Sequence, residues 1–192
     1  FEHTSRLIDF TSFVVALYDQ ETDVLSFPLV IEKGDRLSVT PTQGGNTLLN
    51  HIIKTKTPVL VEENLEAYAA SLGIQLRTVG ESAKSWLAVP ILLGEMAVGV
   101  ISVQTVTTPR LYTEHHRDLL VSIANQAAIA YQNASSFDQV QRQNQELASL
   151  NEMSQVLTTL VDEEAILAQI HLFTTRLIQT QDFFVALYDE TT

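Results

Sequence analysis

Two runs of apolar, largely β-branched residues, 85–93 and 96–104, flank the dipeptide Gly94-Glu95. A two-residue loop that begins with glycine is typical of a type II′ turn, so this pattern predicts a tight antiparallel hairpin. Neither strand is polar along one whole face. Both faces are therefore expected to be covered, which makes these the central strands of a sheet.

The hairpin register divides the side chains between the two faces of this sheet. With a two-residue loop, Ser85 pairs with Gln104 and Leu87 pairs with Ser102. One face then carries the strand residues of a candidate ligand pocket, namely Ser85, Leu87, Val89, Ser102 and Gln104. The opposite face carries the small residues Ala88, Ala97 and Gly99, where we expect a helix to pack. Pro90 cannot donate to the ladder, and a bulge there would change the register.

The remaining pattern predicts the other elements of an α+β fold. Strands are expected at 13–19, 24–32 and 59–61. Helical spacing predicts one helix between an Asn46 cap and the stop at Thr57-Pro58, an acidic helix over 62–72, and a long helix from about Glu114. Another helix is expected over 152–179, with a break near Val161-Asp162. A polar loop over 77–84 leads into the hairpin.

The long helix carries two apolar stripes in different frames. The first runs from Leu120 to Phe137 at three-four spacing, and the second resumes through Val140, Asn144 and Leu147. A change of frame separates a helix that packs on its own domain from one that packs on a partner. Asn144 occupies a position otherwise taken by apolar residues, where a buried amide fixes register. The pattern predicts a parallel homodimer through Phe137, Val140, Asn144 and Leu147.

The two ends of the chain repeat one another. Residues 1–22 align without gaps on 171–192, and the motif Ala-Leu-Tyr-Asp occurs in both. We interpret this as the period of a tandem array. The expected organisation is a first domain at 1–134 with a truncated opening helix, a connector helix at 135–150, and the start of a second repeat at 151–192.

Composition limits the classes of partner. The 192 residues are 45% apolar, enough for one core and part of another. A net charge of −12 with eleven scattered basic residues argues against a nucleic-acid partner. The chain has neither an apolar run long enough to cross a membrane nor an export signal, so we predict a cytoplasmic protein. It contains no cysteine, which excludes disulfides and thiolate chemistry.

Catalytic and metal-binding motifs are weak. The adjacent pair His115-His116 has no second cluster of ligands beside it, and Glu62-Glu63 and Glu163-Glu164 are typical of solvated helix ends. The hydroxyl residues have neither a nucleophile elbow nor a paired histidine. The sequence therefore predicts neither a catalytic residue nor a metal site, and favours a protein that is not an enzyme.

Several of these stretches together resemble a known family. The hairpin from Trp86 to Gln104, the motif Tyr112-Thr113-Glu114, the helix through Ala124-Asn125-Gln126 and the segment 45–62 are similar to the GAF domain. This resemblance implies an antiparallel sheet of five or six strands, with terminal helices on one face and a small-molecule pocket on the other. It also implies tandem arrays that feed an output domain, such as the histidine kinase of a two-component system or a diguanylate cyclase.

The ligand-defined subfamilies fit less well. Bilin-binding members attach their chromophore through cysteine, so the absence of cysteine excludes covalent bilin here. Cyclic-nucleotide-binding members carry an Asn-Lys…Phe…Asp-Glu signature after the last strand, where this chain has Gln104-Thr105 and His116-Arg117. No other cofactor is implied, and a non-covalent ligand stays unidentified.

Two functions follow from the sequence. The first is a sensory domain with Ser85, Ser102 and Gln104 at the mouth of an apolar pocket, roofed by Tyr68 and the loop 77–84. The second is a structural module that dimerises and relays helix movement, with its pocket filled by its own side chains. An apolar strand face that carries three small polar groups is compatible with both functions.

Overall fold

The computed structural model describes residues 8–76, 81–159 and 162–178, together with Phe184 and Ala186. The chain divides into two compact units, Phe1–Gln132 and Asn133–Thr192, each considered by itself below. Most of the predicted strand 183–189 and of the opening stub 1–10 lies outside the described residues.

The first unit is built on one antiparallel sheet of seven strands, in the order β3-β2-β1-β7-β6-β5, with β4 paired to β2. Its strands are β1 (Ser12–Asp19), β2 (Val24–Glu32), β3 (Asp35–Leu37), β4 (Thr42–Gln43), β5 (Val59–Val61), β6 (Ser85–Leu93) and β7 (Met96–Thr105). The predicted hairpin is β6 and β7, and both of its strands are central, as predicted. The short β3 and β4 carry too few residues to show an alternating pattern in the sequence.

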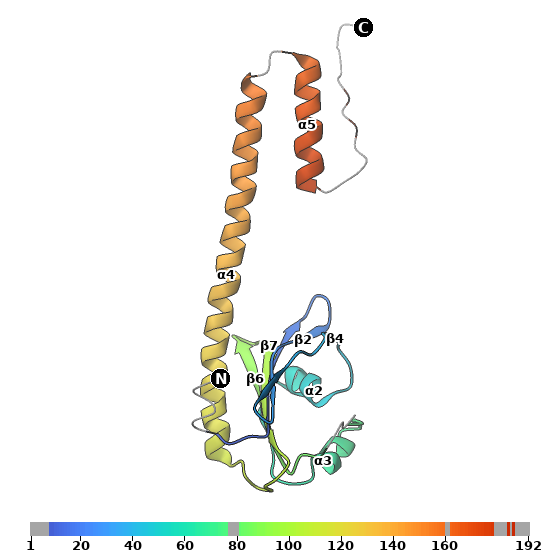
Figure 1. Ribbon diagram of the computed structural model, residues 1–192, viewed down its shortest axis with the longest axis vertical. Coiled ribbons are helices and arrows are strands. Elements are labelled where there is room, and N and C mark those ends of the chain that lie inside the picture. Colours follow the sequence, from blue (N-terminus) through green and yellow to red (C-terminus); the bar gives the residue numbers. More distant parts are fainter. Residues whose placement is uncertain (1–7, 77–80, 160–161, 179–183, 185, 187–192) are drawn as a thin grey trace. The chain divides into compact units, whose positions relative to one another are not determined.

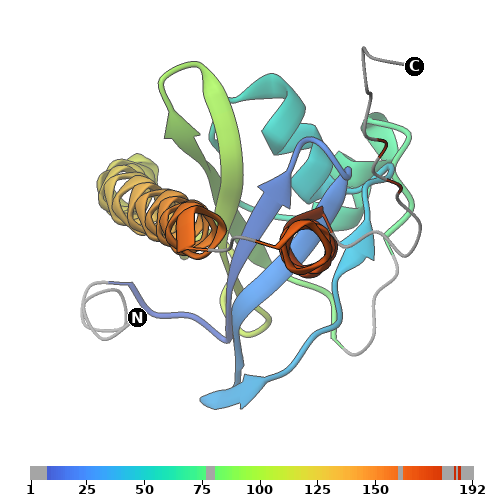
Figure 2. The same ribbon diagram turned by 90° about the horizontal axis from the view of Figure 1, so that it is seen from above.

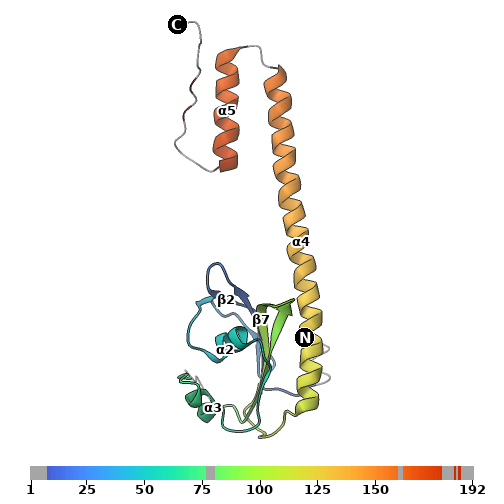
Figure 3. The same cartoon turned by 180° about the vertical axis from the view of Figure 1, so that it is seen from behind.

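Helices cover both faces of this sheet, as Figures 2 and 3 show. The long helix α4 (Glu114–Thr159) begins on one face, while α2 (Leu48–Thr55) and α3 (Leu65–Ser71) lie on the other. The two faces are called here the α4 face and the α2/α3 face. The predicted α+β architecture, with a terminal helix on one face and a long helix following the domain, is therefore confirmed.

Each face has its own hydrophobic core. On the α4 face, Leu120, Ala124 and Ala128 of the helix pack against alternate residues of β6 and β7. On the α2/α3 face, Ile52 and Ile53 of α2 pack against Ala88, Ala97 and Val100 of the hairpin, among others. Strands that are buried on both sides in this way read as continuous apolar runs, which explains the pattern of residues 85–93.

The helix ends follow from local capping. The hydroxyl of Thr47, rather than the predicted Asn46, accepts the backbone N–H of Asn50 at 3.2 Å and caps α2. Asn64 caps α3 in the same way, and α3 is shorter than the predicted helix 62–72. Lys56 ends α2 in a left-handed conformation just before Thr57-Pro58.

The predicted hairpin register holds only near the turn. Gly94 has φ of 59° and Leu93 pairs with Met96, as expected for the two-residue loop. Between Ile91 and Leu92 a bulge then shifts the pairing by one residue, so that Ser85 lies opposite Thr105 and not Gln104. Side chains alternate along a strand, so a shift of one residue changes which side chains of β7 share a face with those of β6. Every pair between the bulge and the open end of the hairpin is affected.

The second unit contains the remainder of α4 and the helix α5 (Glu163–Ile178) (Figure 1). The sequence predicted a new helix from residue 152, but α4 continues without interruption to Thr159. Asp162 then caps α5, because its carboxylate accepts the backbone N–H of Ala165 at 3.4 Å. None of the helices in the described part of the chain is long and apolar enough to cross a membrane.

Candidate functional site

The structure divides the predicted pocket residues between the two faces of the sheet. Leu87 and Val89 lie on the α4 face, fully buried in the core beneath α4. Ser102 pairs with Ala88, and Gln104 pairs with Trp86, so these two polar side chains share the α2/α3 face. The prediction that all of them line one pocket is wrong, and the bulge in the hairpin is the reason.

The small residues are divided in the same way. Ala88 and Ala97 pack on the α2/α3 face, under α2, and not under α4 as predicted. Gly99 pairs with Ile91 and with Leu17, which both belong to the α4 face. Of the three, Gly99 alone lies where the sequence placed it.

Ser85 has a structural role on the α4 face. Its hydroxyl donates to the carbonyl of Val61 and accepts the backbone N–H of Tyr112, both at 3.4 Å. The phenol of Tyr112 in turn donates to the carbonyl of Asp9 at 3.1 Å. Ser85 therefore links strands β5 and β6 to the segment that enters α4, and its hydrogen-bonding groups are occupied within the protein.

The polar side chains of the α2/α3 face gather where β1 and β7 pair. Ser12 lies opposite Gln104, and Val14 lies opposite Ser102. Alternation along β1 places Ser12 and Val14 on the same face as Ala16, which belongs to the α2/α3 core. Ser12, Ser102 and Gln104 thus form one polar cluster beside Trp86.

The polar cluster has no side-chain hydrogen-bond partner among the described residues. Ser12 is 8% exposed and Ser102 is 5% exposed, yet no side-chain hydrogen bond joins Ser12, Ser102 or Gln104 to another described residue. No fully enclosed side-chain nitrogen or oxygen among the described residues lacks a partner. The polar atoms of the cluster must therefore face a space that solvent can enter, since otherwise they would be buried and unsatisfied.

The apolar neighbours of the cluster support the same conclusion. Val14 pairs with Val30 across β1 and β2, and neither side chain belongs to either hydrophobic core. These two side chains therefore lie outside the clusters that pack against α2 and α3, although Val30 is only 8% exposed. We call the surface the open floor, and it consists of Ser12, Val14, Val30, Ser102 and Gln104.

The open floor offers hydrogen-bonding groups but no charge. Its two hydroxyls can donate and accept, and its carboxamide offers both a donor and an acceptor, while none of the five side chains is charged. Apolar walls with a few polar groups are the usual lining of a small-molecule site. Tyr68 of α3 packs against the core of the same face, but residues 77–80 of the predicted roof 77–84 lie outside the described residues.

Other depressions on the first unit have charged, exposed rims. One of about 480 Å³ lies between the end of α2 and the hairpin tip, with Tyr18, Lys54 and Lys56 at its edge. Another of about 490 Å³ borders Glu63 and Arg110, which form an exposed ion pair of 2.8 Å. Exposed pairs of this kind contribute little to stability or specificity.

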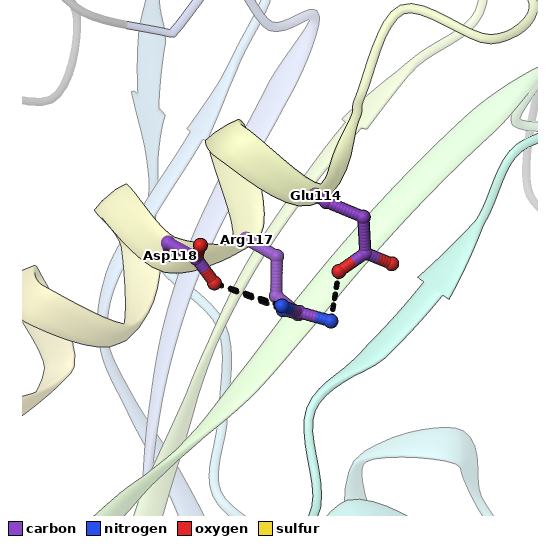
Figure 4. A network of polar contacts seen from close by, with 3 residues as sticks. All are labelled: Glu114, Arg117 and Asp118. Carbon is purple, nitrogen blue, oxygen red and sulfur yellow. Dashed lines mark hydrogen bonds and ion pairs between the residues drawn. The ribbon is translucent and has the colours of Figure 1, made fainter.

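The titratable residues at the start of α4 are engaged with one another. Arg117 forms ion pairs with Glu114 and with Asp118, the latter at 2.9 Å (Figure 4). The hydrogen bonds that the guanidinium of Arg117 donates to the carboxylate of Asp118 are the main cause of the raised pKa of Arg117. The Nδ1 atom of His116 accepts the backbone N–H of Thr113 at 3.2 Å, which caps the helix. No group of three or more His, Asp or Glu side chains in the described part of the chain could hold a metal ion.

Sequence reasoning missed Ser12 and Trp86. Ser12 comes from β1, which is distant in sequence from the hairpin, and only the pairing of β1 with β7 brings it to Gln104. Trp86 was assigned to the face of Ala88, which is correct, but the register placed Gln104 on the other side. A search for a bulge one residue beyond Pro90 could have found the correct grouping.

The comparisons with known proteins agree with this architecture. The family model of the GAF domain matches residues 2–132. The GAF domain of Acinetobacter phosphoenolpyruvate-protein phosphotransferase superposes with a TM-score of 0.58 at 15% identity, covering 70% of this chain and 79% of that one. The GAF-B domain of DevS from Mycobacterium smegmatis superposes with a TM-score of 0.56 at 16% identity, and the match covers 72% of this chain and 92% of that one.

Two further solved structures show how varied the proteins with this fold are. Residues 122–287 of a methyl-accepting chemotaxis protein give a TM-score of 0.58 at 17% identity, covering 69% of this chain and 84% of that one. A free methionine-R-sulfoxide reductase from Thermoplasma acidophilum superposes with a TM-score of 0.51 at 12% identity, and the match covers 66% of this chain and 82% of that one. No curated protein sequence matches the chain. The family match covers more than half of the residues, so the chain belongs to the GAF domain family.

Proposed function

We propose that this chain is a sensory domain of a cytoplasmic signal-transduction protein. In this proposal a small molecule with uncharged polar groups binds on the open floor. Its binding biases the position of α4, which carries the signal toward an output domain of the histidine kinase or diguanylate cyclase type. The chain has no cysteine, so the ligand is not attached through a thioether as a covalent bilin would be.

One observation carries the proposal. Ser102 is almost fully buried, but its hydroxyl has no partner among the described residues and still has access to solvent. A hydroxyl that only completed a packed core would bond to a neighbouring backbone or side-chain group, as Ser85 does. Ser102, Ser12 and Gln104 instead leave donors and acceptors available to a ligand.

Structural neighbours support a regulatory setting. A methyl-accepting chemotaxis protein and DevS both contain a domain of this fold. A continuous helix of 46 residues that begins on the domain and extends beyond it is also suited to connect a sensor to an output. A reductase shares the fold as well, and we place this chain with the regulatory members because the titratable groups at the start of α4 serve as a helix cap and in ion pairs.

A second function is favoured by the other end of the same face. Ala16, Ala88 and Val100 are completely buried against α2, so this half of the face is filled by the protein's own side chains. If the open floor is likewise closed in solution, the domain acts as a structural relay without a ligand. The two functions differ in whether any small molecule stabilises the folded state.

A thermal-shift screen tests the sensory function. A panel of purines, flavins, sugars and amino acids is added to the chain, and a ligand present at about 100 times its Kd should stabilise the fold by about 2.7 kcal/mol. The substitution Gln104→Ala should reduce that shift, whereas Ser122→Ala on the exposed surface of α4 should leave it unchanged. Each variant is compared with its own ligand-free midpoint. A shift that is equal in both variants would place the ligand elsewhere.

A further inference from the structure

The hairpin end of the α2/α3 face carries a depression of about 480 Å³, called here the hairpin depression. It lies between the last turn of α2, the turn of the β6–β7 hairpin and the end of β1. Apolar side chains line it: Ile53 and Ala97 are buried, and Met96 is 47% exposed. A hollow of this size with apolar walls is large enough to hold a small molecule.

The hairpin depression is separate from the open floor. Tyr18 lines the depression and Ser12 belongs to the open floor, and the two residues lie near opposite ends of β1. At about 3.3 Å per residue of strand, these positions are about 20 Å apart. Ala16 lies between them and is completely buried in the core of the same face. A ligand in the hairpin depression would therefore occupy a second site.

The charges around the hairpin depression are mainly positive. Lys54 and Lys56 line it, and Glu95 is the one carboxylate among its lining residues. The chain has four lysines in all, so half of them meet here, in a protein whose net charge is −12. No hydrogen bond or ion pair within the described part of the chain uses either ammonium group, whereas Arg110 and Arg117 both pair with carboxylates. Both ammonium groups are therefore available to an anion.

The two lysines also act on the end of α2. Cations near a helix C-terminus offset the negative end of the helix dipole. The carbonyl of Ile52 in this last turn already accepts the backbone N–H of Lys56 at 2.7 Å. Offsetting the dipole uses the charge of the side chains but no particular hydrogen bond, so the donors of both ammonium groups remain available.

Tyr18 offers its ring to the hairpin depression. Its hydroxyl donates to the carboxylate of Asp23 at 2.9 Å, and its ring packs against the core of the α2/α3 face. Met96 lines the same space, and a flexible thioether side chain adapts to the shape of an apolar group. The lining thus combines an apolar surface with two cationic groups at its edge.

We propose that the hairpin depression binds a small carboxylate with an apolar body. The carboxylate accepts hydrogen bonds from Lys54 and Lys56, and the body lies against Tyr18, Ile53 and Met96. Charge complementarity selects the anion, because an uncharged analogue leaves both ammonium groups without a charged acceptor. The proposal does not depend on what binds the open floor.

Methionine methyl NMR tests the place and the class of ligand. Met96 lines the depression, while Met153, the other methionine, belongs to the second unit and serves as the internal reference. Phenylacetate and indole-3-acetate are titrated into the full chain, and each is compared with its uncharged amide. Each acid should shift the Met96 signal until the shift saturates, in the millimolar range expected of so small a ligand. Each amide should bind about tenfold more weakly.

Two outcomes of the titration would overturn the proposal. Equal affinities for acid and amide would show that the lysines do not select an anion. A Met96 signal that neither acid moves, up to the limit of solubility, would show that the depression does not bind carboxylates of this kind.

Charge-matched variants test the two lysines. The double substitution Lys54→Gln with Lys56→Gln should weaken phenylacetate binding about tenfold, because both charge-assisted hydrogen bonds are lost. Lys33→Gln with Lys84→Gln removes the same charge outside the depression and should change the binding little. Circular dichroism and the melting midpoint check that both variants are folded. Equal weakening by the two variants would assign the effect to net charge, and unchanged binding in the first would equally contradict a site at this place.

Discussion

At the scale of single residues, Gly99 on β7 is the glycine with the closest backbone neighbour. A Cβ atom added there would lie 2.4 Å from the carbonyl oxygen of Ala16 and 3.2 Å from the Cδ1 atom of Ile91. The first contact is with backbone in the neighbouring strand, which cannot move without disturbing the β1–β7 ladder. Gly99 therefore allows β1 and β7 to pair closely at the centre of the sheet.

Gly99→Ala should destabilise the fold. We expect a loss of about 1–3 kcal/mol in the free energy of unfolding, because the added methyl group overpacks the strand pair. Urea denaturation measures the difference. Gly45→Ala is the matched control, since a Cβ there meets no atom within 4 Å. Equal midpoints for the two variants would show that the sheet accommodates the methyl group.

Tyr112 gives the fold a dependence on alkaline pH. Burial, with a smaller contribution from the charge of Asp9, raises the pKa of its phenol above the ordinary value of 10.0. In the unfolded chain the phenol loses its proton near pH 10, while in the folded chain it keeps it. The unfolded state then binds fewer protons, so stability is full below pH 10 and falls as the pH rises further.

Tyr112→Phe should remove this part of the pH dependence. Between pH 9 and pH 11, the free energy of unfolding should fall less steeply in the variant than in the wild type. At neutral pH the variant should lose about 1 kcal/mol, because the hydrogen bond to the carbonyl of Asp9 is absent. Tyr131→Phe, on the exposed side of α4, is the control. A wild-type slope that persists in Tyr112→Phe would assign the effect to other groups.

At the scale of elements, the hairpin shows how far the sequence determines the site. The apolar runs, the Gly94-Glu95 turn and the central position of both strands are predictable, because each depends on local pattern. The bulge near Pro90 is not fixed by local pattern, and it exchanges the faces of Ser85 and Gln104 relative to one another. Ser12 joins the site through a long-range strand pair, which a single sequence does not reveal.

The link between the sheet and α4 can be tested at Ser85. Ser85→Ala leaves the backbone N–H of Tyr112 without its acceptor in a buried position, which should cost about 1–3 kcal/mol. Amide hydrogen exchange at Tyr112 should quicken in the variant. Ser71→Ala removes an exposed hydrogen bond to the carbonyl of Tyr68 and serves as the control. Unchanged exchange at Tyr112 would show that Ser85 does not hold the entry to α4.

At the scale of the whole molecule, the open floor and the start of α4 lie on opposite faces of the sheet in the first unit. The open floor belongs to the α2/α3 face, and α4 packs on the other. Trp86 of β6 lies on the α2/α3 face, beside Gln104. Its neighbour Ser85 accepts a hydrogen bond from the backbone of Tyr112, in the segment that enters α4. Strand β6 therefore contacts both the open floor and the segment that leads into α4. A ligand that favours one position of β6 would shift the equilibrium of α4 by its difference in affinity for the two states.

Trp86 also provides the most direct measurement of the central claim, that a small molecule binds on the open floor. It is the only tryptophan of the chain and pairs with Gln104, so its fluorescence reports on this site without a label. Titration with each compound that raises the melting midpoint should change the emission of Trp86 until the change saturates. The substitution Gln104→Ala should weaken that binding about tenfold, because it removes the carboxamide that can bond to the ligand. Ser122→Ala should leave the binding unchanged. Saturable stabilisation by a compound that leaves Trp86 emission unaltered, with equal affinity in both variants, would contradict the account.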